Sequence, residues 1–374
     1  MTRDETISCR KEHIAPLEVR FVFDGAVGDV LRRCLDSDRQ NETIGSTFKI
    51  YYQLRPLIPI SVRQWLQKRR NQSIDVPPSW YIPGGMVSEL HAAVAQNSDC
   101  QVIHPWPDRF QMAVSLTHDV ETKQGMLGIE RVAKMEEERG LRSSWNLVPY
   151  KYKVDLGVVR ELQQRGHEVG IQGYNHDGRL FESKRVFDRR AEPINEAIRG
   201  YGAKGFRSPM VHRNLDWMQS LDIDYDASTF DVDPFQAMPG GVGSVWPLIV
   251  GKFVELPYTQ PQDHTLLVSL GEKTPKIWID KFHFLRRLAG MAMVITHPDY
   301  LDSSARLDVY RQYLDFVAEQ TDCWNALPHE IATWWRTRDK MTIVNENDSP
   351  QVVGPASERA RLVSLGTCCQ PSLT

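Results

Sequence analysis

The sequence has no run of apolar residues that approaches the roughly 18 needed for a membrane-spanning helix. Its first residues, MTRDETISCRKEH, contain no apolar stretch of the kind that marks a secretory signal. The six cysteines form no CxxC pair and follow no regular spacing, which favours reduced thiols over a disulfide framework. The formal net charge is only −3, so nothing in it indicates a nucleic-acid partner. These absences lead us to expect a cytoplasmic protein that binds no nucleic acid.

The length and composition are those of an ordinary globular protein. The chain has 374 residues, of which 41% are hydrophobic and 25% charged. This length suits one domain of about 250 residues with extensions, or two smaller domains. We predict an N-terminal extension at 1–104, a main domain at 105–340 and a tail at 341–374. The tail has little apolar periodicity, and we therefore expect it to be disordered.

One segment of the extension, residues 48–70, combines aromatic and basic side chains in the sequence FKIYYQLRPLIPISVRQWLQKRR. This combination suits a membrane interface, where rings lie at headgroup level and cations meet anionic lipid. The alternative is a basic helix packed on the main domain, although Pro56 and Pro59 would interrupt a long helix. Peripheral membrane contact through 48–70 is therefore one of two expectations for this segment.

From residue 105 onward, short apolar runs alternate with helix-like stretches. Helices are expected at 129–139, 156–165, 183–199, 305–319 and 329–338, and the first three are each followed closely by a glycine. Such alternation implies parallel strands joined by helical crossovers, which is an α/β fold. The seven strand candidates suit a barrel somewhat smaller than the eight-stranded form; they lie at 112–116, 144–148, 169–171, 205–207, 223–225, 253–256 and 292–296.

Polar groups follow most of these strands, as an active site on one barrel face requires. The clearest case is QMAVSLTHDVE at 111–121, where an apolar run leads into His118, Asp119 and Glu121. A carboxylate beside an imidazole can hold a metal or move a proton. The alternative for this stretch alone is a strand followed by a polar turn.

Five segments, in order, resemble the motifs of the NodB-homology polysaccharide deacetylases: LTHDVE, GHEVGIQGYNHDG, GFRSP, YDAST and ITHPDY. The resemblance covers about residues 105–335. It implies a distorted (β/α)7 barrel and the use of a divalent metal, usually Zn²⁺, to hydrolyse acetyl groups on sugars. The flanking phrases LRPLIP, STFDVDPF and LPYTQPQDHTL resemble a subgroup whose first motif is HDV-acid. That subgroup is associated with surface-polysaccharide and glycoconjugate synthesis.

The resemblance leaves two alignments open for the first motif, whose common form, TFDD, has a base followed by a metal ligand. In one alignment His118 stands at the base position and Asp119 at the ligand position. In the other, which follows a D-x-D pattern, Asp119 is the base and Glu121 the ligand. We favour Asp119 as the ligand, with His118 or a nearby carboxylate as the base.

The second motif of the family, H-x-x-x-H, supplies two imidazole ligands, but here only the second is present. His176 stands at that position, and Gln172 replaces the first histidine. Because zinc prefers imidazole or thiolate to an amide oxygen, we expect the metal to bind more weakly. Glu121, Asp263 or His264 could supply the missing ligand. The alternative is that His176 has lost its metal role and caps a turn.

Two further roles follow from the resemblance. Arg207 fits the R-x-P motif, whose arginine orients the catalytic carboxylate. His297 fits the last motif, whose histidine protonates the leaving amine as a general acid. A backbone N–H near Met210 is expected at the oxyanion, and aromatic candidates for stacking on a sugar are Trp145, Tyr174, Trp246 and Tyr258.

The sequence thus predicts a metal-dependent hydrolase that removes an acetyl or related acyl group from an amino sugar in polysaccharide or glycoconjugate metabolism. Its mechanism would be metal-assisted attack of water on an amide. The replacement at Gln172 motivates an alternative, a family member that binds a carbohydrate without hydrolysing it. The segment 48–70 motivates another, a peripheral assembly protein on a membrane.

Overall fold

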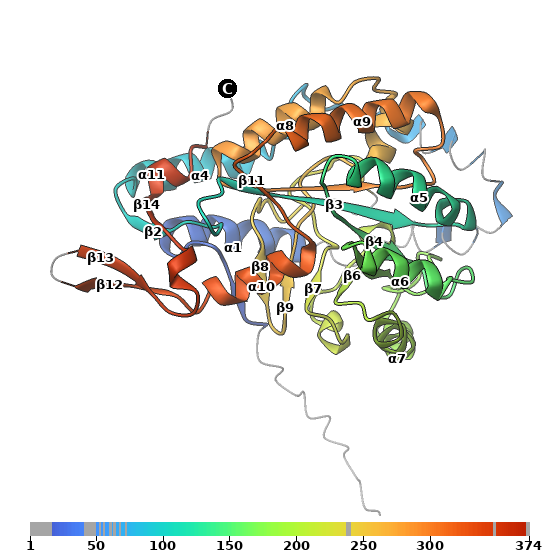
Figure 1. Ribbon diagram of the computed structural model, residues 1–374, viewed down its shortest axis with the longest axis horizontal. Helices are drawn as coiled ribbons and strands as arrows, with labels where there is room; N and C mark the ends of the chain where they lie inside the picture. Colours follow the sequence, from blue (N-terminus) through green and yellow to red (C-terminus); the bar gives the residue numbers. More distant parts are fainter. Residues whose placement is uncertain are drawn as a thin grey trace, which may run out of the picture.

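A curled sheet of mostly parallel strands forms the centre of the molecule, and helices cover it (Figure 1). The computed structural model describes residues 17–40, 73–236, 241–346 and 349–371, and between 50 and 71 only positions 50, 51, 54, 57–59, 62, 65, 66 and 69–71. Seven parallel strands make up the barrel: β3 (Met112–Val120), β4 (Ser143–Leu147), β5 (Glu168–Gln172), β6 (Gly205–Arg207), β7 (Tyr225–Asp226), β9 (Phe253–Glu255) and β10 (Met291–Thr296).

All seven predicted strands are present, which confirms the α/β barrel. They lie in the order β9-β7-β6-β5-β4-β3-β10. The largest difference is at β3, which runs to Val120 instead of residue 116. The added residues include Thr117, His118 and Asp119, which are buried and find polar partners on both sides of the sheet.

Side chains of β3 alternate between the interior of the barrel and its helix-covered exterior. The parallel register pairs Asp119 with Asn146 and Gln172 with Arg207, and all four side chains point into the barrel at the carboxyl ends of their strands. His118 is paired with Trp145 and points to the opposite face. This alternation decides which polar residues of the first motif can reach a common site.

The barrel closes through irregular backbone bonds between β10 and the segments before β8 (Leu248–Val250) and after β9. The N–H groups of Thr259 and Gln260 donate to the carbonyl of Met293, and the N–H of Met291 donates to the carbonyl of Val245. This closure without a regular ladder is the distortion that the resemblance implied.

Helices on the outside return the chain from each strand to the next. Four begin at a side chain that accepts a backbone N–H bond, namely Thr122, Asp155, Ser183 and Ser303. The barrel helices are α5 (Lys123–Glu137), α6 (Leu156–Gln164), α7 (Lys184–Tyr201), α8 (Lys276–Arg287), α9 (Ser304–Ala318) and α10 (Pro328–Arg338). All but α8 were predicted. Shorter turns of helix lie at Pro209–Val211, Trp217–Ser220, His264–Leu270 and Ser357–Arg359.

The N-terminal region packs on the barrel. Helix α1 (Gly25–Arg39) lies against α4 (Gly84–Gln96), and both contribute to the same hydrophobic core as the barrel strands. A short strand, β1 (Val19–Arg20), pairs antiparallel with β8 beside β9. Strand β11 (Cys323–Asn325) pairs with the start of β3.

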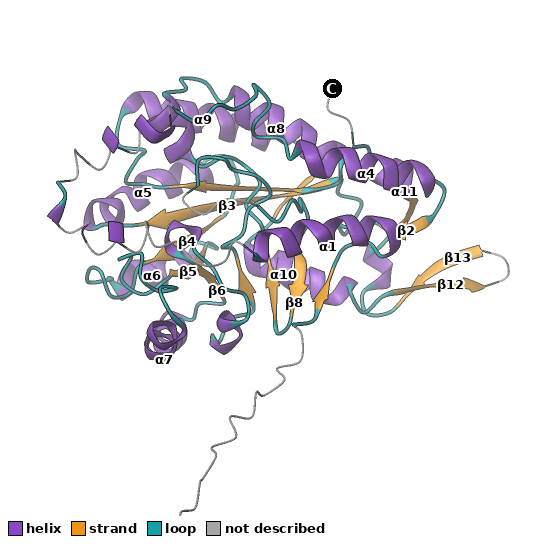
Figure 2. Ribbon diagram, turned by 180° about the vertical axis from the view of Figure 1, so that it is seen from behind, coloured by secondary structure: helices purple, strands orange, loops and turns teal. Residues whose placement is uncertain are grey.

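The prediction of a disordered tail is wrong. Strands β12 (Thr342–Glu346) and β13 (Ser349–Val353) form a hairpin that projects from the body of the molecule (Figure 2). Beyond it, β14 (Leu362–Ser364) pairs with β2 (Gln101–Ile103), and α11 (Leu365–Cys368) buries Leu365 and Cys368 in the main core. The sequence of the tail shows no apolar periodicity because it buries only a few apolar side chains. These pack on β2 and α4, which are distant in sequence.

The segment predicted to contact a membrane is only partly described. Several of its residues, such as Lys49, Arg55 and Lys68, lie outside the described residues. In the part of the chain that is described, no helix has the length and apolar character needed to cross a bilayer.

Candidate active site

The carboxyl ends of four barrel strands bring together a cluster of polar side chains, most of which are buried. Asp119 and Glu121 come from β3 and the turn after it, Gln172 from β5, Arg207 from β6 and His297 from the turn after β10. His176, from the loop after β5, joins the cluster through an ion pair with Glu121. In parallel barrels this end of the strands is where catalytic groups lie.

Asp119 is held by three N–H donors. Its Oδ1 accepts from Arg207 Nη1 at 3.0 Å and from Asn146 Nδ2 at 3.0 Å, and its Oδ2 accepts from Gln172 Nε2 at 3.1 Å. Arg207 is itself fixed, because it also donates to Thr117 Oγ1 at 2.9 Å. The carboxylate is therefore fixed in orientation by an arginine, as the R-x-P motif implied.

Asn146 was missed by the sequence prediction. Its side chain fits because Gly170, its neighbour on β5, has no Cβ; an added Cβ would lie 2.2 Å from Asn146 Oδ1. The available signal was a polar residue at an inward position of the strand SSWNL, two places from the equally polar Ser144.

Glu121 lies between two imidazoles. Its Oε1 is 2.8 Å from His176 Nε2 and 3.8 Å from His297 Nε2. Burial alone would raise the pKa of Glu121, but the adjacent His176 outweighs it and holds the pKa well below the usual range. Asp299 accepts the backbone N–H of Glu121 at 3.0 Å and the hydroxyl of Thr122, which ties the first motif to the last.

His297 is paired with Asp263. Its Nδ1 lies 2.7 Å from Asp263 Oδ1, and its backbone N–H donates to Asp263 Oδ2 at 2.7 Å. Burial alone would lower the pKa of His297, but the Asp263 carboxylate outweighs it and raises the pKa to about 10. His297 is therefore an imidazolium at neutral pH, with Nε2 facing Glu121.

The donors in this cluster fit a divalent ion only if an amide oxygen takes part. Among the residues that the structure describes, no three His, Cys, Asp or Glu side chains are grouped so that they could hold a metal. Glu121 and His176 face each other and supply two donors. Gln172 Oε1 is buried and accepts no hydrogen bond, so this oxygen is available as the third. Three protein ligands are what a catalytic metal site needs.

The structure does not place His118 at this cluster. His118 Nε2 lies 2.8 Å from Glu136 Oε1 and its Nδ1 lies 2.7 Å from Thr296 Oγ1, on the helix side of the sheet. Both ring nitrogens have partners and the side chain is fully buried, so the predicted role as base does not fit. Trp145 stacks on this imidazole at 4.0 Å between ring centroids and is fully buried, so it does not fit the predicted role of stacking on a sugar.

Four other predicted residues are occupied elsewhere. Tyr258 is 1% exposed and donates to Asp233 at 3.3 Å, so it is a core residue and not a stacking platform. Asp263 is committed to His297 and not to a metal. His264 packs against Tyr300 with ring centroids 4.9 Å apart, and burial lowers its pKa. Trp246 is buried and donates to backbone carbonyls.

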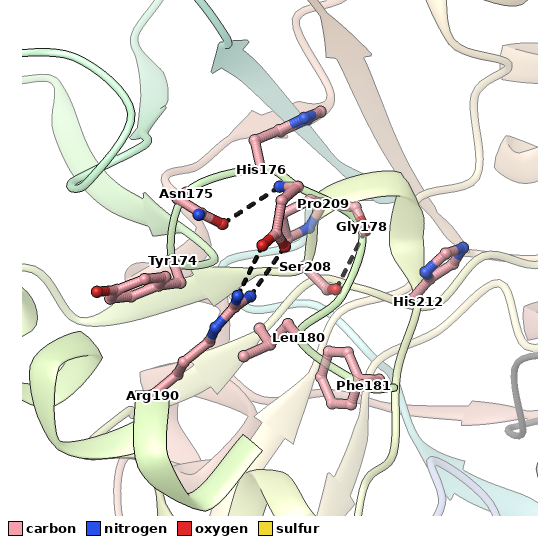
Figure 3. Close-up of a pocket in the computed structure, with 11 residues that line it drawn as sticks. Tyr174, Asn175, His176, Gly178, Leu180, Phe181, Arg190, Ser208, Pro209 and His212 are labelled. Atoms are coloured by element: carbon pink, nitrogen blue, oxygen red, sulfur yellow. Dashed lines mark hydrogen bonds and ion pairs between the residues drawn. The ribbon is translucent and has the colours of Figure 1, made fainter. Parts of the chain in front are cut away.

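A small pocket lies beside the cluster, and Figure 3 shows it below His176. Tyr174 forms part of its wall, with the Arg190 guanidinium 5.0 Å from its ring centroid, and Arg190 also pairs with Asp177 at 2.6 Å. Tyr174 is half-buried, and its role in substrate binding stays a prediction. Met210 has a φ of 56°, a backbone conformation that side chains rarely adopt, and its predicted oxyanion role stays a prediction.

Comparisons with solved structures define the fold. A protein from Mycobacterium smegmatis assigned as a polysaccharide deacetylase matches with a TM-score of 0.53 at 21% identity, over 63% of this chain and 93% of that one. PuuE allantoinase matches with a TM-score of 0.50 at 15% identity, over 62% and 93%. A protein from Pseudomonas aeruginosa PAO1 assigned as a polysaccharide deacetylase matches with a TM-score of 0.50 at 15% identity, over 62% and 94%. No family model and no curated protein matches the chain.

The chain therefore has the polysaccharide deacetylase fold, which confirms the fold expected from the resemblance. The predicted site residues lie at the ends of the strands that carry the motifs. Arg207 holds Asp119 and Glu121 faces His176, which is the arrangement expected from the D-x-acid alignment of the first motif.

Proposed function

We propose that the protein is a hydrolase that removes an acetyl or related acyl group from the nitrogen of an amino sugar in polysaccharide or glycoconjugate metabolism. One observation carries this proposal: the buried cluster holds both a carboxylate fixed by Arg207 and an imidazolium fixed by Asp263. Amide hydrolysis needs a base for the attacking water and an acid for the leaving nitrogen.

In this proposal Asp119 is the base, since its two oxygens are oriented by Arg207, Asn146 and Gln172. His118 was the other candidate for the base, but both of its ring nitrogens have partners on the far side of the sheet. The proton taken from water passes to Asp119. His297 then donates the proton on Nε2 to the leaving nitrogen, while its Nδ1 keeps the proton that it donates in a hydrogen bond to Asp263.

Glu121, Gln172 and His176 are the residues that would hold the divalent ion implied by the resemblance. Such an ion, when bound, polarises an acyl oxygen and lowers the pKa of water. Glu121 sits next to His297, so the ligand carboxylate and the acid are adjacent within the cluster.

The test is acetate release from N-acetylated amino sugars offered free, nucleotide-linked and lipid-linked, with allantoin included because an allantoinase shares the fold. We expect release from at least one sugar and loss of release in Asp119→Asn. Release from none of them, with retained binding of a sugar, would establish the alternative of a carbohydrate-binding protein. Turnover of allantoin alone would overturn the sugar proposal and keep the amide hydrolase.

We propose in addition that the protein works at the surface of a membrane, and on its cytoplasmic side. Among the described positions between 50 and 66, six apolar side chains are more than two-fifths exposed: Ile50, Leu54, Leu57, Val62, Trp65 and Leu66. The sequence from 48 to 70 also holds six Lys or Arg residues and no Asp or Glu. Exposed apolar and basic groups together favour anionic lipid.

The position of this segment supports the membrane proposal. Arg70 donates to the carbonyls of Phe235 at 2.9 Å and Gln236 at 2.9 Å, in the loop that follows the carboxyl end of β7. The segment therefore attaches at the same end of the barrel as the polar cluster, the end to which the β3 arrow points in Figure 1.

Vesicle flotation tests this part of the proposal. We expect binding to phosphatidylserine vesicles that falls several-fold when Leu57 and Trp65 are both changed to Ser. Ile343→Ser, an exposed apolar residue on the distant hairpin, is the matched control and should bind as the wild type does. Absence of binding, or equal binding by all three proteins, overturns the proposal.

A further inference from the structure

The amide of Gln172 has a defined orientation in the buried cluster. Asp119 can only accept hydrogen bonds when ionised, so the group 3.1 Å from its Oδ2 is the Gln172 Nε2 donor. The Oε1 oxygen is on the other branch of the same amide and cannot face that oxygen. Gln172 is 1% exposed, and Oε1 has no hydrogen-bond partner among the described residues.

A buried carbonyl without a partner costs about 1–3 kcal/mol, so proteins rarely leave one unsatisfied. Its partner should therefore be something other than the residues that the structure describes. A cation fits, because the remaining donors of the cluster, Glu121 and His176, could bind the same ion. Glu121 Oε1 lies 2.8 Å from His176 Nε2. Asp119 already accepts three hydrogen bonds, from Arg207, Asn146 and Gln172, of the about four that a carboxylate can accept.

The chemistry of this donor set differs from that of a typical zinc site. Glu121 and Gln172 would each supply an oxygen, and His176 alone a nitrogen. Carboxylate and carbonyl oxygens suit Mn²⁺ and Mg²⁺, whereas imidazole and thiolate suit Zn²⁺. Exchange of an imidazole for an amide oxygen therefore lowers the affinity for Zn²⁺ more than it lowers the affinity for Mn²⁺.

We propose that Gln172 Oε1 is a metal ligand, and that it makes this an exchangeable site for a hard divalent ion such as Mn²⁺ and not a tight zinc site. The amide has two functions, since its Nε2 also orients Asp119. The inference rests on the proposed function only in placing the ion at the same site, and ion binding is measured without turnover.

The experiment measures dissociation constants for MnCl₂ and ZnCl₂ on metal-stripped full-length protein by calorimetry, with the electron paramagnetic resonance signal of Mn²⁺ as an independent measure. We expect the wild type to bind one Mn²⁺. Gln172→His should tighten zinc at least tenfold more than it tightens manganese. Gln172→Leu, of similar size but with no donor, should weaken Mn²⁺ at least tenfold.

Gln312→His, an exposed change on α9, is the control for an added histidine and should leave both constants unchanged. The proposal is overturned if the wild type binds no Mn²⁺, if Gln172→Leu binds it as the wild type does, or if Gln172→His leaves the ratio of the two constants unchanged. If Gln172→Leu fails to fold, the ratio of the Zn²⁺ and Mn²⁺ dissociation constants of Gln172→His still tests the proposal. Lack of acetate release with Mn²⁺ bound would contradict the proposed function alone.

Discussion

At the scale of single residues, the contacts of Asp119 favour the role of base over the role of metal ligand. Three N–H donors surround its carboxylate, and Arg207 at 3.0 Å is among them. A cation beside a carboxylate leaves less negative charge for a metal to share. We therefore expect Asp119→Asn to lower kcat by about 10²- to 10⁴-fold and to change the dissociation constant for Mn²⁺ by no more than about threefold.

The comparison variant is Glu121→Gln, which should do the reverse and weaken Mn²⁺ strongly because it removes a charged ligand next to His176. Calorimetry and acetate release on both proteins make the measurement. If Asp119→Asn loses the ion, Asp119 is a ligand and the original alignment of the motif holds.

The sequence predicted which residues form most of the site, but not the role of each one. The motifs named Asp119, Glu121, His176, Arg207 and His297, and all five lie in one cluster. His118 was assigned to the wrong face because its neighbour Asp119 points inward, and successive residues of a strand point to opposite sides. When every position of a strand is buried, the sequence does not indicate which side chains point into the barrel and which point outward.

At the scale of elements, His118 has a structural function that links β3 to two helices. Glu136 on α5 accepts from the Ser143 hydroxyl at 2.6 Å and from Tyr310 on α9 at 2.6 Å, and it faces His118 at 2.8 Å. Burial alone would raise the pKa of Glu136, but these partners outweigh it and hold the pKa below its usual value.

This shift predicts how stability depends on pH. Because the folded pKa is depressed, ionised Glu136 stabilises the fold at pH values above the unfolded pKa of 4.5, and the contribution is lost as pH falls below it. Glu136→Gln should therefore lower the free energy of unfolding at pH 7 by about 3 kcal/mol. The difference between the two proteins should shrink in urea denaturation at pH 4. A difference that does not change with pH would mean that Glu136 is uncharged in the fold.

A second element-scale prediction concerns the close contact of α5 with the turn after β10. A Cβ on Gly125 would lie 2.2 Å from Asp299 Oδ2, the side chain that accepts the N–H of Glu121. Gly125→Ala should displace Asp299, shift Glu121 and lower kcat by about 10-fold or more, since small displacements of reacting groups are costly. The kinetics of acetate release measure this effect.

Gly200→Ala is the matched control, because Gly200 is exposed near the end of α7 with nothing within 4 Å of an added Cβ. It should leave kcat unchanged and raise stability by about 0.5–1 kcal/mol. Equal activity of the two variants would show that Asp299 does not position Glu121.

The elements themselves were largely readable from periodicity. Strands and helices of the barrel repeat at the spacing that buries one face, and all seven strands were found. What the pattern lacks is information about distant partners. The closure of β10 on Thr259 and Gln260 and the pairing of β14 with β2 depend on residues far apart in the chain, and neither was predicted.

At the scale of the whole molecule, the C-terminal residues divide into a part that stabilises the fold and a part that does not. Leu365, Cys368 and Cys369 are buried in the main core, whereas the β12–β13 hairpin is mostly exposed. Truncation after Gly354 should lower the free energy of unfolding by about 3 kcal/mol or more, because each fully buried apolar side chain contributes about 1.5–3 kcal/mol. Removal of 342–353 with Met341 joined to Gly354 should cost about 1 kcal/mol or less, since the two ends already touch and mainly exposed area is lost. Urea denaturation of both proteins beside the wild type measures the difference, and equal losses would show that the tail acts as one unit or does not contribute to the core.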